Sequence, residues 1–222
     1  MRLLLLALLA GCAALDPPAA EGPGPIAFCE DGSTWSVLDF GPGAALSTYP
    51  DDHWTRPDPS TRTGLRIDLR SDDAVTLAAV PSTWRGLADE LARSDGWGST
   101  AGTVFRFAGE IDPASVTEAS AVVVAFEPAG PVRYAVDVET TAFANTLILR
   151  PRRPLPPATE AATVLFAPAT GADGGCIVPP EALRAILRGE DPLSPRYAAA
   201  LEALAIEPAD VAAMTVFTTA ST

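Results

Sequence analysis

The segment Asp51-Asp52-His53-Trp54 brings two carboxylates together with the one histidine of the chain. Imidazole and carboxylate groups can bind a metal ion or move a proton. Zinc needs three or four protein ligands, and no second histidine or cysteine cluster supplies them. The alternative is a loop in which the aspartates accept hydrogen bonds from backbone N–H groups and Trp54 covers the edge of the fold. We expect this second arrangement, with no cofactor.

Calcium accepts scattered carboxylates and carbonyl groups, so it is the metal hardest to set aside. Asp51 and Asp52 are candidate ligands in a proline-rich segment. Further candidates in predicted loops are Asp58, Asp72, Asp73 and Asp173. None of these carboxylates has the spacing of an EF-hand loop. Calcium at Asp51 and Asp52 is therefore kept as an alternative, and we expect no metal.

Other chemistry in the sequence is limited. A serine hydrolase needs a nucleophilic serine, usually within Gly-x-Ser-x-Gly, together with a histidine and an acid. That pentapeptide is absent, and the stretch around Ser94 lacks the first glycine. We therefore expect no enzymatic activity. A platform of tryptophan rings that stacks against sugars is a further alternative, and its candidate residues are Trp35, Trp54, Trp84 and Trp97. Trp84, however, falls on the apolar face of a predicted helix.

The first twelve residues have the pattern of an export signal. Met1-Arg2 is followed by the apolar run Leu3 to Leu9, far short of the ~20 residues that a spanning helix needs. The run ends in Leu9-Ala10-Gly11-Cys12, which resembles the lipobox of bacterial lipoproteins. The resemblance implies cleavage before Cys12 and lipidation of its sulfur. Ala13 follows, without the acidic residue that retains lipoproteins at the inner membrane, so we expect an outer-membrane or surface location. The alternative is an ordinary secretory signal with an incidental cysteine.

Composition and the remaining cysteines agree with export. The formal net charge of −13 argues against a nucleic acid partner, because phosphate binding needs a basic face. Cys29 and Cys176 remain after the anchor, and an even pair in an oxidising compartment favours a disulfide. The alternative is two buried thiols.

The pattern of elements predicts a mainly β protein. Residues 12–25 form a Pro/Ala/Gly-rich tether, and three prolines in Tyr49–Gly64 predict irregular structure there. A helix is expected at 82–93. Strands are expected from apolar or alternating runs at 65–69, 104–107, 121–126, 132–138, 146–149, 163–166 and 214–219. Two short helices are expected at 179–188 and 194–204, the second with an apolar stripe of Tyr197, Leu201 and Leu204.

The order of features from Val104 to Thr219 resembles a bacterial Ig-like domain of the SbsA type. The matching pieces are Glu110–Thr117, Asn145–Pro151, Pro154–Thr159 and Phe217–Thr219. With the preceding segments, the chain is similar to the N-terminal region of bacterial virulence-factor lipases, which are surface lipoproteins. In those proteins a hydrolase domain follows the Ig-like part.

Together these patterns predict an Ig-like antiparallel β-sandwich at 102–219, with a helical insertion at 179–204. An N-terminal strand–helix region at 26–101 packs on it, after a signal peptide at 1–11. We expect a non-catalytic, lipid-anchored envelope lipoprotein that acts as a spacer or interaction domain for an unknown partner. The alternatives are an accessory domain of a lipase-like hydrolase whose catalytic domain lies outside this chain, and a calcium- or glycan-binding adhesin.

Overall fold

The computed structural model describes residues 26–38, 48–69, 89–141 and 145–222. Several predicted features lie outside these ranges: the signal peptide, Cys12, the tether, Asp72, Asp73 and Trp84. Most of the helix expected at 82–93 lies outside them too, and residues 89–91 of it are helical.

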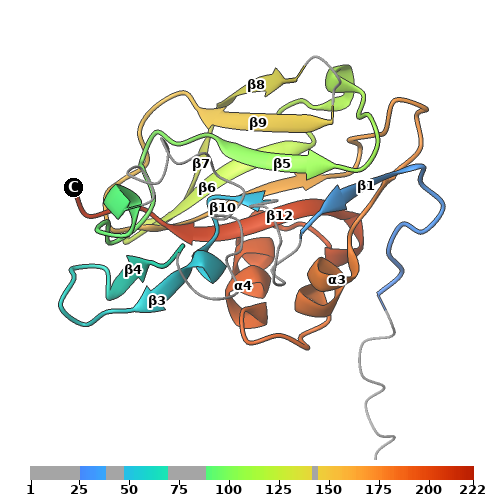
Figure 1. Ribbon diagram of the computed structural model, residues 1–222. Helices are drawn as coiled ribbons and strands as arrows, with labels where there is room; N and C mark the ends of the chain where they lie inside the picture. The colour runs from blue at the N-terminus through green and yellow to red at the C-terminus, as the bar shows by residue number, and fades with distance from the viewer. Residues whose placement is uncertain (1–25, 39–47, 70–88, 142–144) are drawn as a thin grey trace, which may run out of the picture.

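The first sheet has the strand order β11-β1-β5-β9-β8, with β2 pairing β5 at the side (Figure 1). Its strands are β1 (Thr34–Val37), β2 (Thr48–Tyr49), β5 (Thr103–Phe107), β8 (Val136–Thr140), β9 (Thr146–Pro151) and β11 (Ile177–Val178). β11 runs parallel to β1, whereas the other pairs are antiparallel. Buried and accessible residues alternate along β5 and β9, as expected for strands with one face on the core. The first sheet therefore includes strands from both sides of residue 102, where the sandwich was expected to begin.

The second sheet is antiparallel and has the order β12-β10-β6-β7. Its strands are β6 (Ala121–Glu127), β7 (Gly130–Tyr134), β10 (Glu160–Phe166) and β12 (Val211–Thr218). The strands β6, β10 and β12 are apolar without alternation because both of their faces are buried. In β6, for example, Val123 packs between the sheets while Val122 and Val124 pack against the helices.

The strands β7 and β8 follow each other directly, with Ala135 between them. β7 pairs with β6 in the second sheet, and β8 pairs with β9 in the first. The single alternating run expected at 132–138 is thus divided between two sheets, and it closes the sandwich along this side. Along it Tyr134 and Val136 are buried, whereas Val138 is exposed.

Two helices form a third layer beneath the second sheet (Figure 1). They are α3 (Glu181–Leu187) and α4 (Ser194–Leu204), which confirms the helical segments expected there. Tyr197, Leu201 and Leu204 are buried on the face of α4 that meets the sheet. Gly189 ends α3 with a positive φ of 85°, a conformation that residues with a Cβ rarely adopt.

A two-stranded hairpin of β3 (Thr55–Pro57) and β4 (Leu65–Ile67) lies beside the sandwich (Figure 1). It follows the 3₁₀ helix η1 (Asp52–Trp54). The expectation that Tyr49–Gly64 lacks regular structure was therefore wrong. Pro57 is tolerated because it ends β3, which pairs only with β4 and so has no second partner needing its missing N–H.

The remaining short helices are η3 (Pro113–Ser115) and η4 (Pro208–Asp210), each beginning with a proline. In the parts of the chain that the structure describes, every helix is shorter or more polar than a bilayer crossing requires. The expected mainly β sandwich is confirmed, with two sheets over one helical layer.

Candidate functional site

Asp51 is a buried acceptor at the start of η1. Its carboxylate is 1% exposed and accepts hydrogen bonds from the hydroxyls of Tyr197 (2.9 Å) and Thr215 (2.8 Å). The backbone N–H of His53 donates to it as well, at 2.7 Å. Burial raises the pKa of Asp51 to about 6, against the opposing effect of these hydrogen bonds. Asp51 therefore ties η1 to α4 and β12.

Asp52 is the second acceptor of this polar cluster. It accepts from the indole N–H of Trp97 at 3.1 Å and from the backbone N–H and hydroxyl of Thr218 at 3.0 and 2.7 Å. Arg196 of α4 forms an ion pair with it at 2.8 Å and reaches Glu160 at the same distance. Both oxygens of Asp52 are thus occupied by donors from the protein.

The expected loop arrangement agrees with this geometry in part, because the N–H groups of His53 and Thr218 donate to the aspartates, but most of their donors are side chains and Trp54 lies in the core. The calcium alternative fits the geometry poorly. The two aspartates turn inward to protein donors, while the side chain of His53 is exposed and its ring meets Trp54 edge-on. Among the described residues, no three histidine, cysteine or acidic side chains gather closely enough to hold a metal ion. The structure instead assigns Asp51 and Asp52 to holding η1, α4 and β12 together.

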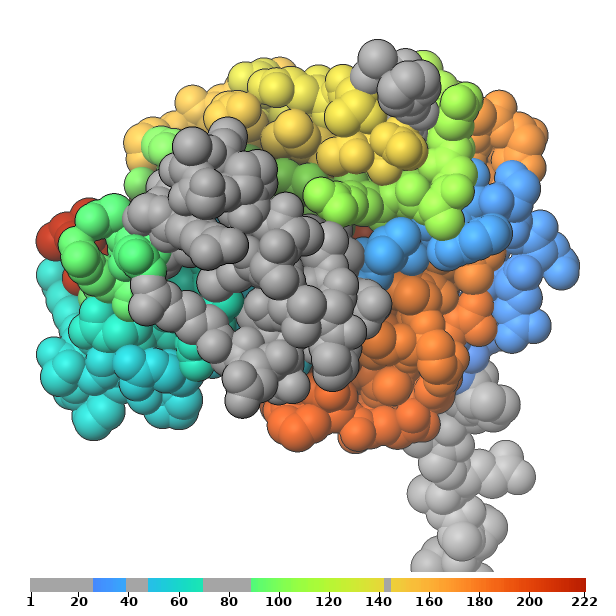
Figure 2. Space-filling view, in the orientation of Figure 1, coloured from blue at the N-terminus to red at the C-terminus, as the bar shows by residue number. Residues whose placement is uncertain are grey.

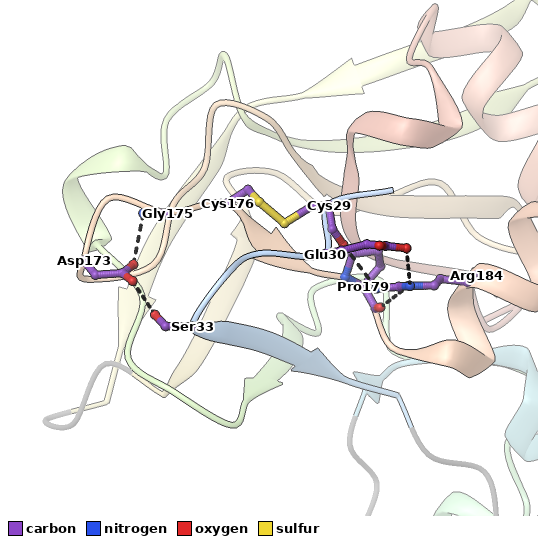
Figure 3. The surroundings of a disulfide bond; sticks show 8 residues. All are labelled: Cys29, Glu30, Ser33, Asp173, Gly175, Cys176, Pro179 and Arg184. Atoms are coloured by element: carbon purple, nitrogen blue, oxygen red, sulfur yellow. Dashed lines mark hydrogen bonds and ion pairs between the residues drawn. A yellow bond between two sulfur atoms is a disulfide. The ribbon is translucent and has the colours of Figure 1, made fainter. Parts of the chain in front are cut away.

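Two other candidate carboxylates also bind within the protein. Asp58 accepts from Ser60 and pairs with Arg66 at 2.6 Å, and these contacts lower the pKa of Asp58. Asp173 accepts from the hydroxyl of Ser33 and the N–H of Gly175, and these two contacts lower its pKa (Figure 3).

The three tryptophans that the structure describes do not form a common platform. Trp54 and Trp97 are buried in the core between the sheets, at 2% and 0% exposure. Trp35 is exposed on β1. The sugar-stacking alternative is therefore wrong for these described residues, because two of the rings needed for it serve as core.

The disulfide between Cys29 and Cys176 is confirmed (Figure 3). It joins the N-terminal strand region to the loop before β11, across 147 positions of sequence. Arg184 of α3 adds a second connection beside the disulfide, because its guanidinium donates to the carbonyls of Pro179 (2.8 Å) and Cys29 (3.1 Å). It also lies 3.7 Å from the carboxylate of Glu30. The first described residues are therefore fastened to the helical layer.

A groove of about 800 Å³ runs beside α4 and is the best candidate for a binding site in the described part of the chain. We call it the helical groove. Its apolar lining includes Ile186, Leu187, Pro192, Ala198, Leu201 and Ile206. Its size is within the range of ordinary ligand sites. In the space-filling view the helical layer, in orange, forms part of the lower surface beside the N-terminal residues in blue (Figure 2).

The polar lining of the helical groove is acidic. Asp191, Glu202 and Glu207 line it. Arg188 also lines it, but Glu190 and Glu181 bind its guanidinium at 2.8 and 2.6 Å and raise its pKa. Sequence reasoning missed the groove, although it identified the buried face of α4. The available signal was the outward series Pro195, Ala198 and Ala205, which repeats at helical spacing.

The fold and the groove define a disulfide-linked β-sandwich with a helical layer that carries an apolar, acid-rimmed surface. Comparison with protein-family models, with curated proteins and with solved structures finds no match for this chain. The resemblances to SbsA-type Ig-like domains and to lipase-like surface lipoproteins therefore remain predictions.

Proposed function

We propose that this chain is a non-catalytic, lipid-anchored lipoprotein of the cell envelope, whose Ig-like sandwich serves as an interaction domain. In this proposal Cys12 carries the lipid, residues 13–25 hold the domain off the membrane, and the helical groove faces a protein partner. In a host with two membranes we expect an outer-membrane or surface location, because Ala13 follows the lipidated cysteine.

The observation that carries the proposal is the Cys29–Cys176 disulfide. Disulfides form and persist in exported proteins and are rare in the reducing cytosol. A second cysteine use, lipidation at Cys12, fits the same compartment. Several acyl chains make a lasting anchor, at roughly 0.8 kcal/mol per buried CH₂, where a single chain binds only reversibly.

The interaction role is supported by the contrast between the buried carboxylates and the exposed apolar groove. The buried carboxylates Asp51 and Asp52 are occupied by structural donors. The helical groove, by contrast, offers apolar surface to solvent. Exposed apolar surface of this kind on a folded domain is typical of a binding site.

Mass spectrometry of the protein extracted from cell membranes tests the anchor. We expect a mature chain that begins at Cys12 and carries a diacylglycerol thioether and an N-acyl group. Cys12→Ser is expected to abolish the modification, while the matched Ala13→Ser, which keeps a small residue at the next position, leaves it unchanged. An unmodified Cys12 in the wild-type chain, or a product that stays in the cytosol, would contradict the proposal.

A photo-cross-linking amino acid in living cells tests the interaction role. Placed at Ala198, which lines the helical groove, it is expected to yield a discrete cross-linked protein. Placed at Ala203, which is exposed on α4 outside the groove, it is expected to yield none. Equal products from both positions would contradict a groove-directed interaction. Hydrolysis of a p-nitrophenyl ester by the purified chain above the rate of the heat-inactivated protein would contradict the non-catalytic role.

A further inference from the structure

We propose that the helical groove binds a basic amphipathic helix of a partner protein, an assignment that rests on the proposed interaction role and names the chemistry of the partner. The occupant would place leucine-like side chains in the groove and lysine or arginine on its flanks. Three properties of the groove support this choice: its apolar lining, its length along α4 and the charge at its rim.

The lining gives the partner an apolar face to cover. Leu187 and Ile206 are half-buried, and Pro192 and Ala198 are exposed, so apolar surface remains open to solvent between the ends of α3 and α4. Covering such surface gains roughly 25 cal/mol per Å² before the costs of association. An amphipathic helix in an apolar groove is a recurring way to do so.

The shape favours a helix over an irregular segment. α4 has 11 residues, which corresponds to a length of about 16 Å. Its lining residues Pro195, Ala198 and Leu201 are spaced by three positions and so follow one side of the helix, and Ala205 continues the lining just past its end. The small side chain of Ala198 on α4 allows a second helix axis to approach to about 8–10 Å. About three turns of a partner helix would match this face.

The charge selects a basic partner. Asp191, Glu202 and Glu207 line the groove, and no ion pair within the described chain involves any of them. The lining cation Arg188 is already bound by two glutamates. Complementary charges favour lysine and arginine on the partner, and they act mainly on the association rate and on specificity.

The same charge disfavours two other occupants. A surface of anionic lipid would be repelled by the acidic rim. A second copy packed through this groove in a two-fold dimer would bring two acidic rims together. A partner of opposite charge meets neither cost, so the observations favour it over both.

A fluorescence anisotropy titration tests the proposal. The probe is a labelled synthetic peptide of about 14 residues, with leucines at i, i+3, i+4 and i+7 and lysines beside them. It is titrated into the full protein in phosphatidylcholine nanodiscs, with empty nanodiscs as the blank. We expect saturable binding that weakens with salt, and binding at least about tenfold weaker for a peptide with glutamate in place of lysine.

A matched pair of variants locates the binding. Ala198→Arg puts a bulky cation into the groove and is expected to weaken binding at least about tenfold, or ~1.4 kcal/mol. Ala203→Arg adds the same charge to an exposed position of α4 outside the groove and is expected to stay within about twofold of the wild type. Both sites are exposed, so both variants are expected to fold, and circular dichroism checks this. Equal affinity of the two variants, or no binding to the wild type, would overturn the proposal.

Zero-length carbodiimide coupling maps the contact. The peptide is amidated at its C-terminus and has no acidic residue, and the protein contains no lysine, so an amide between a lysine side chain and a carboxylate must join the peptide to the protein. We expect the coupled sites to be Asp191, Glu202 or Glu207, and to be lost in Ala198→Arg. Coupling spread over distant carboxylates such as Glu118 and Glu139 would contradict groove binding.

The outcome of the peptide titration can be distinguished from the outcome of the test for lipidation at Cys12. If mass spectrometry finds Cys12 unmodified, the same titration is made on the soluble chain, and the groove is still accepted or rejected. Self-association that Ala198→Arg abolishes would assign the groove to a second copy instead. Flotation with anionic vesicles that depends on Ala198 would assign it to a membrane. Either result overturns the basic helix as occupant.

Discussion

The hydroxyl of Tyr197 donates a hydrogen bond to the carboxylate of Asp51 over 2.9 Å, although 146 positions of sequence separate the two residues. Both side chains are buried. The contact joins the middle of α4 to the start of η1, and so connects the helical layer to the segment that leads into the β3–β4 hairpin. Its energetic role can be measured directly.

Tyr197→Phe is expected to lower the free energy of unfolding by about 1–3 kcal/mol, because it removes a donor from a buried carboxylate and supplies none in its place. Tyr134→Phe is the matched control, since the hydroxyl of Tyr134 binds the more accessible Glu127. Its loss should cost about 1 kcal/mol or less. Urea denaturation measures both, and equal losses would contradict the structural role given to Asp51.

The titration of Asp51 predicts an unusual dependence of stability on pH. The pKa of Asp51 is raised by burial to about 6 in the folded chain, compared with 3.8 for the exposed group. Between these values the folded state binds more protons than the unfolded state. The contribution of Asp51 to stability is therefore full below pH ~3.8 and is lost as pH rises through ~6. Two pKa units correspond to about 3 kcal/mol.

The comparison that isolates this effect is between the wild type and Asp51→Asn. The asparagine has no proton to gain, so the difference in unfolding free energy between the two proteins should fall by about 3 kcal/mol from about pH 4 to about pH 7. Asp58, Asp95 and Asp173 have lowered pKa values and favour the opposite trend, but they are present in both proteins. A difference that stays constant with pH would show that Asp51 does not titrate in this window.

Two arginines on different surfaces should differ greatly in their effect on stability. Arg196→Met is expected to cost about 2–3 kcal/mol, because it leaves the buried carboxylate of Asp52 without its counter-charge. Arg152→Met removes an ion pair to Asp137 whose side chains are both 58% exposed, and should change stability by less than about 0.5 kcal/mol. Thermal and urea denaturation test this, and a large loss for Arg152→Met would refute the distinction.

Reduction of the disulfide should destabilise the protein strongly. Cys29 and Cys176 close a loop of 147 positions, for which chain entropy gives about 5 kcal/mol as an upper figure. Adding a reductant is expected to lower the urea midpoint of the wild type. The double variant Cys29→Ser/Cys176→Ser should start at the lower midpoint and should not respond to reductant. A urea midpoint of the wild type that does not change with reductant would contradict a stabilising disulfide.

Local patterns predicted much of the fold. The alternation in β5 and the apolar runs of β6 and β10 predicted strands, and the stripe of Tyr197, Leu201 and Leu204 predicted the buried face of α4. An apolar run reveals that a strand is buried on both faces, but it does not say what covers each face. The apolar runs are therefore compatible with a helical layer over the second sheet, but they do not predict it.

The site was harder to predict, for two physical reasons. Asp51 and Asp52 follow a proline in a polar segment, which is typical of a solvated loop, whereas distant donors from α4 and β12 allow them to be buried. The helical groove depends on how the end of α3 lies beside α4, and no local spacing encodes that arrangement.

The connection at Arg184 and Cys29 has a mechanical consequence. A pulling force applied at residue 26 travels only three positions along the chain before it reaches a covalent bond to the loop that leads into β11 and α3. The ladder between β1 and β5 lies beyond that bond, so its hydrogen bonds are shielded from being opened one after another. A pulling force would load the bond between Cys29 and Cys176 and the hydrogen bond from Arg184 to Cys29 first, and the ladder between β1 and β5, inside the sheet, would stay closed under a force that could otherwise open it.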